Sequence, residues 1–426
     1  MAVSRRAFLA GVAASGAAAR VGGLPGIAAG ASPQIRPPRL PAPARSGIEH
    51  IVVLCMENRS FDHFLGWVPK ARGRQAGLTY ADDEGELHRT HHLEEWTGCG
   101  FNDPDHSYSG GRVQLAQGRV DGFRLGRNDD YALGYFKGKD LATTSQLVSN
   151  FTICDRWFAS FLGPTFPNRL YTHSAATDRI SNTFDPCLLP TIWDRLATAG
   201  VPANYYFSDL PFLGLYEGRY APISRPLTEF FVQAGAGTLP PYSYLDPSFI
   251  GATQNDDHPH ADIRRGQNLV GRIVKALLES PQWSSTVLIV TYDEWGGFFD
   301  HVRPPRLPDD VAGAGTADHA QAGFRVPAYI VSPFARPGRV AGRTFDHSAI
   351  LKFVEWRFGL KPLTKRDRAS NNLAHVLDFT RPNLVPPELK VPADPGPSPC
   401  LALVSPADEE SLWRDFASSR RLTSWG

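Results

Sequence analysis

The chain has 426 residues, of which 42% are hydrophobic and 20% are charged, and its formal net charge is +1. A chain of this length and composition can bury a large core and is ordinary for a globular protein. The balanced charge excludes a strongly basic protein, so we expect no nucleic-acid partner. The 39 glycines and 36 prolines favour long connections that carry function.

The first 31 residues are predicted to be an export signal. The segment Ser4–Leu9 matches the twin-arginine pattern, and an Ala- and Gly-rich stretch follows it. Cleavage after Ala19 and cleavage after Ala31 both fit. Residues 32–46 are rich in Pro and Ala and predict an extended linker. No later stretch has the roughly 18 continuous apolar residues that span a bilayer. We therefore expect an exported protein without a transmembrane segment, which is periplasmic, cell-wall-associated or secreted.

Residues 47–378 alternate between strand and helix patterns. Strands are expected over four apolar runs, namely Ile48–Met56, Phe151–Phe158, Val287–Tyr292 and Val326–Val331. Helices are expected after Ser60 as N-cap with Gly66 as stop, and over Leu141–Val148, Gly266–Ser280, Asp346–Phe358 and, in the tail, Glu409–Ser418. The alternation predicts an α/β domain with a mostly parallel central sheet flanked by helices on both faces.

Two regions show no clear period. Residues 183–253 are dense in aromatic residues, Pro and Gly, and we expect them to form a cap or wall on the substrate side. Residues 379–426 form a proline-rich tail that is expected to run over the surface before its short helix.

Two pairs of residues with oxygen-bearing side chains each follow a predicted buried strand. Glu57 and Asn58 follow the first strand, and Asp293 and Glu294 follow the strand that ends at Tyr292. Ligands of open parallel sheets bind beyond the carboxyl ends of the strands, so both pairs are expected at one crevice. Their oxygen atoms suit a hard divalent cation such as Ca²⁺, Mg²⁺ or Mn²⁺ better than Zn²⁺.

A turn at residues 163–169 presents Thr165 to the same crevice. A hydroxyl bound to a divalent cation loses its proton readily and becomes a nucleophile, so Thr165 is predicted to be the nucleophile of a metal-assisted hydrolase and to be a metal ligand as well. The helix expected after the turn would favour an anion at its N-terminus. The alternative interpretation is that Thr165 is an ordinary N-cap.

The five cysteines contain no C-x-x-C pair, which argues against a zinc–thiolate site. Cys55 lies within a predicted strand and is expected in the core. An oxidising compartment permits one or two disulfides among the other four, with the pairing left open, and the odd number leaves at least one free thiol.

Four motifs occur in order: ENRSFDH at residues 57–63, GPTFPNR at 163–169, DHP at 257–259 and YDEWGGFFDH at 292–301. This set resembles the bacterial phosphoesterase family of secreted phospholipases C and acid phosphatases, which has the alkaline phosphatase fold. The resemblance spans residues 49–359 and implies a single metal ion. The phospholipase C branch carries threonine where the acid phosphatase branch carries serine, so Thr165 favours phospholipase C.

The resemblance also marks His106 and His258 as catalytic residues that bind the phosphoryl group or protonate the leaving oxygen. Weaker candidates for substrate binding are His260, His301 and His347. Arg169 is either a phosphate ligand or a buried ion-pair partner. Asp62 and His63 are expected to organise the metal loop from behind.

The function expected from these residues is cleavage of a phosphodiester of the phosphatidylcholine type, at a membrane surface, through a phosphothreonine intermediate. A broad acid phosphatase acting on phosphomonoesters is the alternative. A non-catalytic secreted binding protein is a more distant one. The sequence leaves open the identity of the metal, the headgroup and the oligomeric state.

Overall fold

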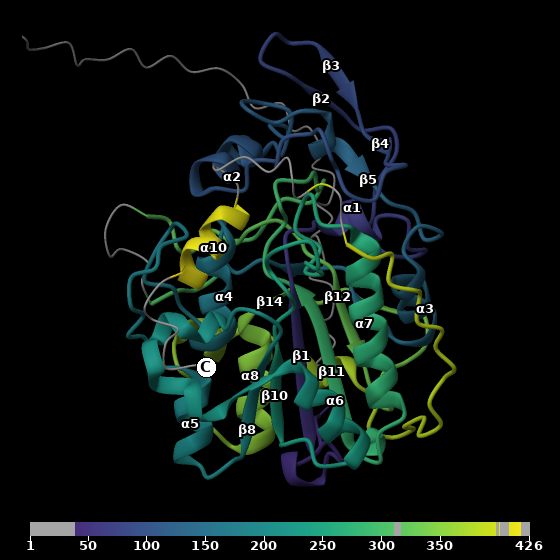
Figure 1. Cartoon of the computed structure of the whole chain (residues 1–426), viewed down its shortest axis with the longest axis vertical. Helices are drawn as coiled ribbons and strands as arrows, with labels where there is room; N and C mark the ends of the chain where they lie inside the picture. The colour runs from purple at the N-terminus through teal and green to yellow at the C-terminus, as the bar shows by residue number, and fades with distance from the viewer. Residues whose placement is uncertain (1–38, 311–316, 398–399, 401–408, 419–426) are drawn as a thin grey trace, which may run out of the picture. The chain divides into compact units, whose positions relative to one another are not determined.

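An eight-stranded sheet forms the centre of the computed structural model, with the strand order β13-β6-β12-β11-β1-β10-β8-β9 (Figure 1). The structure describes residues 39–310, 317–397, 400 and 409–418, so the predicted export signal and the first part of the linker lie outside the described residues. The strands are β1 (His50–Met56), β6 (Thr152–Cys154), β8 (Ala203–Phe207), β9 (Ser224–Pro226), β10 (Tyr242–Leu245), β11 (Thr286–Tyr292), β12 (Ala328–Val331) and β13 (Arg339–Ala341).

The sheet is mostly parallel, because β12 alone runs against its two neighbours, β11 and β6. β1 and β11 lie side by side at its centre, and every residue of both strands is buried. Strands covered on both faces are apolar throughout, which is why the sequence shows them as continuous runs. Three pairs of short strands accompany the sheet: β7 (Trp157–Phe158) with β14 (Phe345–Asp346), β2 (Thr79–Ala81) with β3 (Leu87–Arg89), and β4 (His91–His92) with β5 (Gly134–Tyr135).

Helices cover both faces of the sheet, which confirms the predicted α/β architecture (Figure 1). One group contains α3 (Ala142–Asn150), α6 (Leu227–Ala236) and α7 (Ile263–Leu278), and the other contains α4 (Thr165–Ser174), α5 (Ile192–Thr198) and α8 (Ser348–Phe358). The remaining helices are α1 (Phe61–Leu65), α2 (Tyr108–Leu115), α9 (Lys365–Ala369) and α10 (Glu409–Ser418). Short 3₁₀ helices are η1 (Pro43–Arg45), η2 (Ala116–Gly118), η3 (Asp130–Leu133), η4 (Phe212–Ile223), η5 (Trp283–Ser285) and η6 (Leu373–Val376).

Local sequence signals located the strands β1, β11 and β12 and several of the helices. Ser60 caps α1 by accepting a hydrogen bond from the backbone N–H of His63, and Gly66 ends the helix, as predicted. The strand expected over residues 151–158 is two short strands, β6 and β7, separated by a turn. The helix expected from Asp346 begins at Ser348, because Asp346 pairs with Phe158 as the end of β14.

The expectation for residues 183–253 needs a correction. These residues supply β8, β9 and β10 to the central sheet rather than only a cap. Their strands escaped detection because successive residues such as Tyr205 and Tyr206 are both buried, so the alternation typical of a half-exposed strand is missing. The segment between α1 and α3, which carries α2 and β2–β5, lies instead at the end of the sheet where α1 follows β1 (Figure 1).

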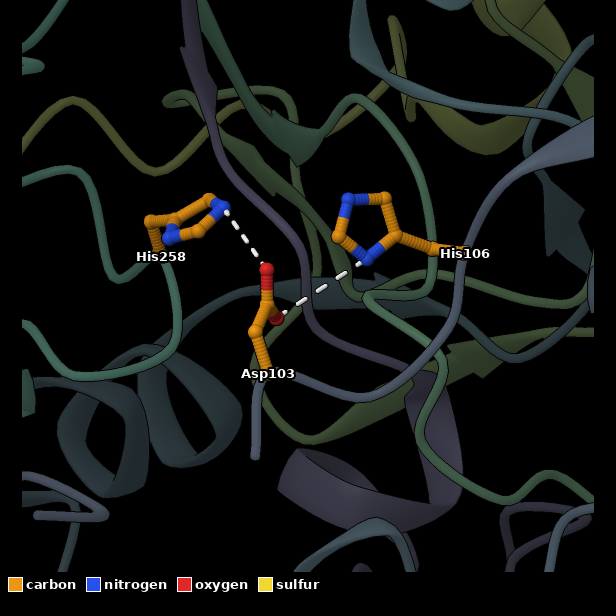
Figure 2. Close-up of side chains that lie close together, drawn as sticks. All are labelled: Asp103, His106 and His258. Atoms are coloured by element: carbon orange, nitrogen blue, oxygen red, sulfur yellow. Dashed lines mark ion pairs between the residues drawn. The ribbon is translucent and has the colours of Figure 1, made fainter. Parts of the chain in front are cut away.

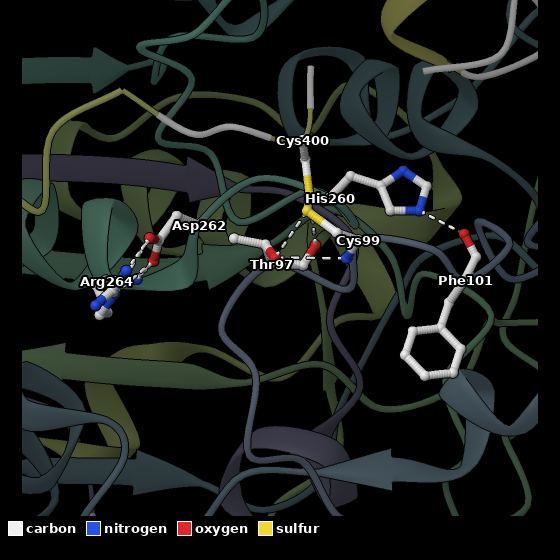
Figure 3. Close-up of a disulfide and its surroundings, with 7 residues drawn as sticks. All are labelled: Thr97, Cys99, Phe101, His260, Asp262, Arg264 and Cys400. Atoms are coloured by element: carbon white, nitrogen blue, oxygen red, sulfur yellow. Dashed lines mark hydrogen bonds and ion pairs between the residues drawn. A yellow bond between two sulfur atoms is a disulfide. The ribbon is translucent and has the colours of Figure 1, made fainter. Parts of the chain in front are cut away.

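Cys99 and Cys400 form a disulfide that ties the loop before α2 to the C-terminal part of the chain (Figure 3). Cys55, Cys154 and Cys187 are free and buried, so the core location predicted for Cys55 is confirmed. Within the described residues, the helices are too short or too polar to cross a bilayer.

Candidate active site

Three neighbouring parallel strands end side by side, and an acidic residue follows each one. In the pairing register, Met56 of β1 lies beside Tyr292 of β11, and Leu54 of β1 lies beside Leu245 of β10. The residues that follow these strand ends are Glu57, Asp293 and Asp246, and all three are fully buried. The predicted convergence of the first two acidic segments at one edge of the sheet is therefore present in the fold, with a third carboxylate beside them.

Asn58 is held in an unusual backbone conformation at this edge. Its φ is 60°, in the left-handed region that asparagine tolerates better than most residues. Its backbone N–H donates a hydrogen bond to Oδ1 of Asp293 over 3.1 Å, and the N–H of Glu294 donates to the same oxygen over 2.7 Å. Gly296 lies so close that an added Cβ would be 2.1 Å from the Asn58 carbonyl oxygen, so this position requires glycine.

Thr165 is the first residue of α4, and its hydroxyl donates a hydrogen bond to Oδ1 of Asn58 over 3.3 Å. Pro164 occupies the N-cap position, so the interpretation of Thr165 as an ordinary N-cap is wrong. The Asn168 side chain stabilises the turn before the helix by donating to the carbonyl oxygens of Gly163 and Pro164. The hydroxyl is thereby fixed beside the acidic strand ends.

Arg169 lies one turn further along α4 and is fully buried. Its Nε is 3.2 Å from Oε1 of Glu57 and 3.1 Å from Oδ2 of Asp293, and its Nη1 is 2.8 Å from Oδ1 of Asp246. Burial would lower the pKa of Arg169, but the fields of the surrounding carboxylates raise it well above its usual range. Arg169 is thus a buried ion-pair partner, as one of its two interpretations predicted, and its role as a phosphate ligand stays a prediction.

His106 and His258 come together beside Asp103, although they lie in separate loops (Figure 2). Nδ1 of His106 and Nε2 of His258 are each 3.9 Å from an oxygen of Asp103. Nδ1 of His106 also lies 2.8 Å from the Pro104 carbonyl, and Nδ1 of His258 lies 3.0 Å from the Pro259 carbonyl. A carbonyl can only accept, so both Nδ1 atoms carry protons and Nε2 is the atom that each ring offers for chemistry.

The Nε2 atom of His106 lies 3.9 Å from Oε1 of Glu294, one of the predicted metal ligands. The pair of histidines therefore lies beside Glu294, at the edge of the predicted metal site. Both rings are largely buried, as is Asp103. This position suits groups that bind a phosphoryl oxygen or transfer a proton to a leaving oxygen.

Two of the three weaker histidine candidates, His347 and His260, are hydrogen bonded to backbone carbonyl groups. His347 is buried between Trp157, which donates to its Nδ1, and the Asp293 carbonyl, to which its Nε2 is hydrogen bonded. Burial lowers the pKa of His347 to about 4, so the ring is neutral and fixes the Asp293 backbone. His260 is hydrogen bonded to the Phe101 carbonyl over 2.9 Å. None of these contacts tests a role in substrate binding.

His301 takes part in an ionic network whose other members, Asp62, Asp300 and Arg325, are fully buried. Its Nδ1 is hydrogen bonded to Asp62, and Arg325 forms ion pairs with Asp62 over 3.0 Å and with Asp300 over 2.9 Å. Asp62 thus connects α1 to the segments that carry Asp300 and Arg325. His63 stacks on Phe298 with ring centroids 3.8 Å apart.

Two groups among the described residues bring three potential metal-ligand atoms within 4.8 Å of one another, Asp103–His106–His258 and Asp62–Asp300–His301. In the second group, Arg325 forms ion pairs with both carboxylates. The first group borders the predicted metal site.

Four of the predicted metal ligands, Glu57, Asn58, Asp293 and Glu294, directly follow the neighbouring strands β1 and β11, and the fifth, Thr165, is hydrogen bonded to Asn58. Side chains that offer only oxygen donors fit a Ca²⁺-, Mg²⁺- or Mn²⁺-like ion.

Sequence reasoning missed three residues that shape the site. Asp246 directly follows a strand, as Glu57 does, but the strand Tyr242–Leu245 was not recognised. Arg325 lies within an irregular segment just before β12 and has no local signal of its role. Asp103 precedes His106 by three residues, and this spacing could have marked it.

The fold and the site define a class of enzyme: a hydroxyl nucleophile candidate, buried oxygen donors and flanking histidines at the carboxyl edge of a parallel sheet. Residues 48–361 match the Phosphoesterase family, and the chain belongs to this family. The protein is accordingly a hydrolase that acts on phosphoester bonds.

Curated relatives include the non-specific phospholipase C6 of Arabidopsis thaliana, which is 31% identical over 367 residues covering 76% of this chain and 71% of the relative. Phospholipase C A of Mycobacterium tuberculosis is 31% identical over 422 residues, covering 81% of this chain and 80% of the relative. Among solved structures, an alkaline phosphatase superfamily protein from Vibrio parahaemolyticus aligns with a TM-score of 0.38 and 12% identity, over 78% of this chain and 72% of that chain.

Proposed function

We propose that the protein is an exported, metal-dependent phospholipase C that cleaves a phosphodiester of the phosphatidylcholine type. The observation that supports this most directly is the hydrogen bond between the Thr165 hydroxyl and Asn58, at the edge where Glu57 and Asp293 also lie. The names of the relatives point to phospholipase C among the activities of the family.

Glu57, Asn58, Thr165, Asp293 and Glu294 would hold one divalent cation. When bound, the cation would lower the pKa of the Thr165 hydroxyl and offset negative charge on the phosphoryl oxygens. The acidic segments come from strands that are hydrogen bonded to each other, so the donors are in place before the ion binds.

Catalysis would proceed in two displacements. In the first, Oγ1 of Thr165 forms a bond to phosphorus in line with the departing oxygen, and the bond from phosphorus to diacylglycerol breaks. His106 or His258, as an imidazolium, gives a proton from Nε2 to the departing oxygen. In the second, water bonds to phosphorus and gives a proton to the neutral imidazole left by the first step, the bond from phosphorus to Oγ1 breaks, and the phosphorylated headgroup leaves. Substrate contacts would come from His260 and His301, because protein groups already engage the side-chain nitrogens of Arg169 and His347.

Export is part of the proposal. The twin-arginine pattern at Ser4–Leu9 supports it, and the disulfide between Cys99 and Cys400 fits an oxidising compartment. The substrate would then be met at a membrane surface.

The test compares two chromogenic substrates, p-nitrophenylphosphorylcholine and p-nitrophenyl phosphate, with the protein as purified, after chelation, and after return of Mg²⁺, Mn²⁺ or Ca²⁺. We expect turnover of the diester that is lost on chelation and restored by one of these ions. Turnover of the monoester alone would select an acid phosphatase instead. Absence of turnover with both substrates would favour a binding protein, and activity that survives complete chelation would contradict the metal site.

A further inference from the structure

The guanidinium of Arg169 occupies the space between the two acidic segments proposed to bind metal. Glu57 and Asp293 each place an oxygen 3.1–3.2 Å from its nitrogens. Its Nη2 also donates to the carbonyl oxygens of the last two residues of β1, over 3.2 and 3.4 Å. All three nitrogens therefore have protein partners, which fixes the planar group in one orientation.

The position of Arg169 on α4 links it to the nucleophile. Thr165 and Arg169 are four residues apart on the same helix, so their side chains emerge from the same side of α4. One turn of helix thus brings the hydroxyl to Asn58 and the guanidinium to Glu57. The contacts of Arg169 hold the start of α4 against the strand ends.

The guanidinium is sealed from water. The Phe249 ring lies against it, with Cζ of Arg169 4.7 Å from the ring centroid, and Trp413 of α10 stacks on Phe249 at 4.2 Å. Arg169 has no exposed surface. Charges in such surroundings are poorly screened, so the positive charge acts strongly on every nearby group.

A permanent cation beside two metal-ligand carboxylates would oppose the binding of a divalent ion unless its charge were balanced. Asp246 provides that balance. Its Oδ1 is 2.8 Å from Nη1 of Arg169, and its Oδ2 accepts a hydrogen bond from the Tyr205 hydroxyl. Both carboxylate oxygens of Asp246 are thus engaged within the protein, and its charge faces Arg169.

We propose that Arg169 and Asp246 are a positioning pair: Arg169 holds Glu57, Asp293 and the start of α4 in register, and Asp246 cancels its charge so that a divalent cation can bind. This inference rests on the metal site in the proposed function. It makes Arg169 a positioning residue that acts through the metal ligands.

The test measures the Kd of Mn²⁺ alone, by isothermal titration calorimetry, for four proteins. Asp246→Asn keeps the shape of the side chain but removes its charge, so we expect Mn²⁺ to bind at least about tenfold more weakly, because the charge on Arg169 is no longer balanced. The double variant Asp246→Asn/Arg169→Gln removes both charges and should bind Mn²⁺ more tightly than Asp246→Asn, because no unbalanced positive charge remains beside the ligands. Tyr205→Phe removes a hydrogen bond to Asp246 without a change in charge and should bind Mn²⁺ like the wild type.

The recovery in the double variant separates charge balance from structural damage, because damage from two buried substitutions would accumulate. Wild-type affinity in Asp246→Asn, or a double variant weaker than Asp246→Asn, would overturn the inference. If Asp246→Asn does not fold, a double variant that folds and binds Mn²⁺ supports charge balance, and a double variant that fails to fold or to bind Mn²⁺ overturns the inference. A wild-type protein that binds no Mn²⁺, Mg²⁺ or Ca²⁺ would instead overturn the proposed metal site itself.

Discussion

The hydroxyl of Thr165 donates a hydrogen bond to the side-chain oxygen of Asn58, a residue 107 positions earlier in the chain. The contact joins the first residue of α4 to the loop that follows β1. It depends on the left-handed backbone of Asn58 and on the turn that Asn168 stabilises. Since both partners are fully buried, the hydroxyl has a defined orientation before a substrate arrives.

Replacement of Thr165 by alanine is expected to remove the nucleophile. We expect kcat for p-nitrophenylphosphorylcholine to fall at least about 10³-fold. The thermal unfolding temperature should stay within a few degrees of the wild-type value. Thr165→Ser keeps a hydroxyl and should retain measurable turnover. Acid-quenched wild-type enzyme should carry a phosphorylated peptide that contains Thr165. Near wild-type turnover in Thr165→Ala would show that another group attacks phosphorus.

His106 and His258 are expected to contribute to catalysis through Nε2. His106→Asn and His258→Asn should each lower kcat by about 10²–10⁴-fold, the usual range for loss of a general acid or base. The control is His88→Asn, because His88 lies in β3 and forms ion pairs with Asp82 and Asp130, which are not among the proposed site residues. Steady-state rates of the three variants provide the comparison. Equal rates in all three would remove both histidines from the mechanism.

The ionic network behind the site is expected to stabilise the fold. Arg325→Gln would leave the buried carboxylates of Asp62 and Asp300 without their cation, which should reduce the free energy of unfolding by about 3–5 kcal/mol. The matched control is Arg306→Gln, since the Arg306–Asp318 pair is exposed and should be worth less than about 1 kcal/mol. Urea-induced unfolding measures both. Similar losses of unfolding free energy in the two variants would show that burial does not increase the contribution of the Arg325 ion pairs to stability.

Glu355 is expected to make stability depend on pH. Burial, and then Asp367, raise the pKa of this α8 carboxyl from 4.5 to about 9. Between these values the native state binds more protons than the unfolded state, so the contribution of Glu355 is complete below pH 4.5 and is lost as the pH rises towards 9. Glu355→Gln should therefore reduce the decline in stability by up to about 1.4 kcal/mol per pH unit in this window.

Urea-induced unfolding at pH 5 and pH 8 measures this effect. The control is Glu279→Gln, because Glu279 forms an exposed ion pair with Lys275 and should leave the wild-type decline unchanged. A Glu355→Gln variant with the same decline as the wild type would show that the carboxyl is already ionised at neutral pH.

Short-range patterns were sufficient for the central strands and several helices. The run ending at Met56 is buried along its whole length, and Ser60 and Gly66 bound α1 as their capping preferences predict. By contrast, the three strands within residues 183–253 were not predicted, because they are only three to five residues long and none alternates between buried and exposed positions. The cysteine pairing was open in the sequence and required the fold, since Cys99 and Cys400 are 301 residues apart.

The sequence by itself determined that acidic residues follow two apolar strands and that a helix follows the turn that carries Thr165, because these are relations between neighbours in the chain. Only the tertiary structure decided that β10 lies beside β1 and adds Asp246 to the site, and that Arg169 lies among three carboxylates. The reason is physical: strand order and the side-chain contacts that depend on it arise from the packing of the whole sheet and its helices, and no local pattern encodes them.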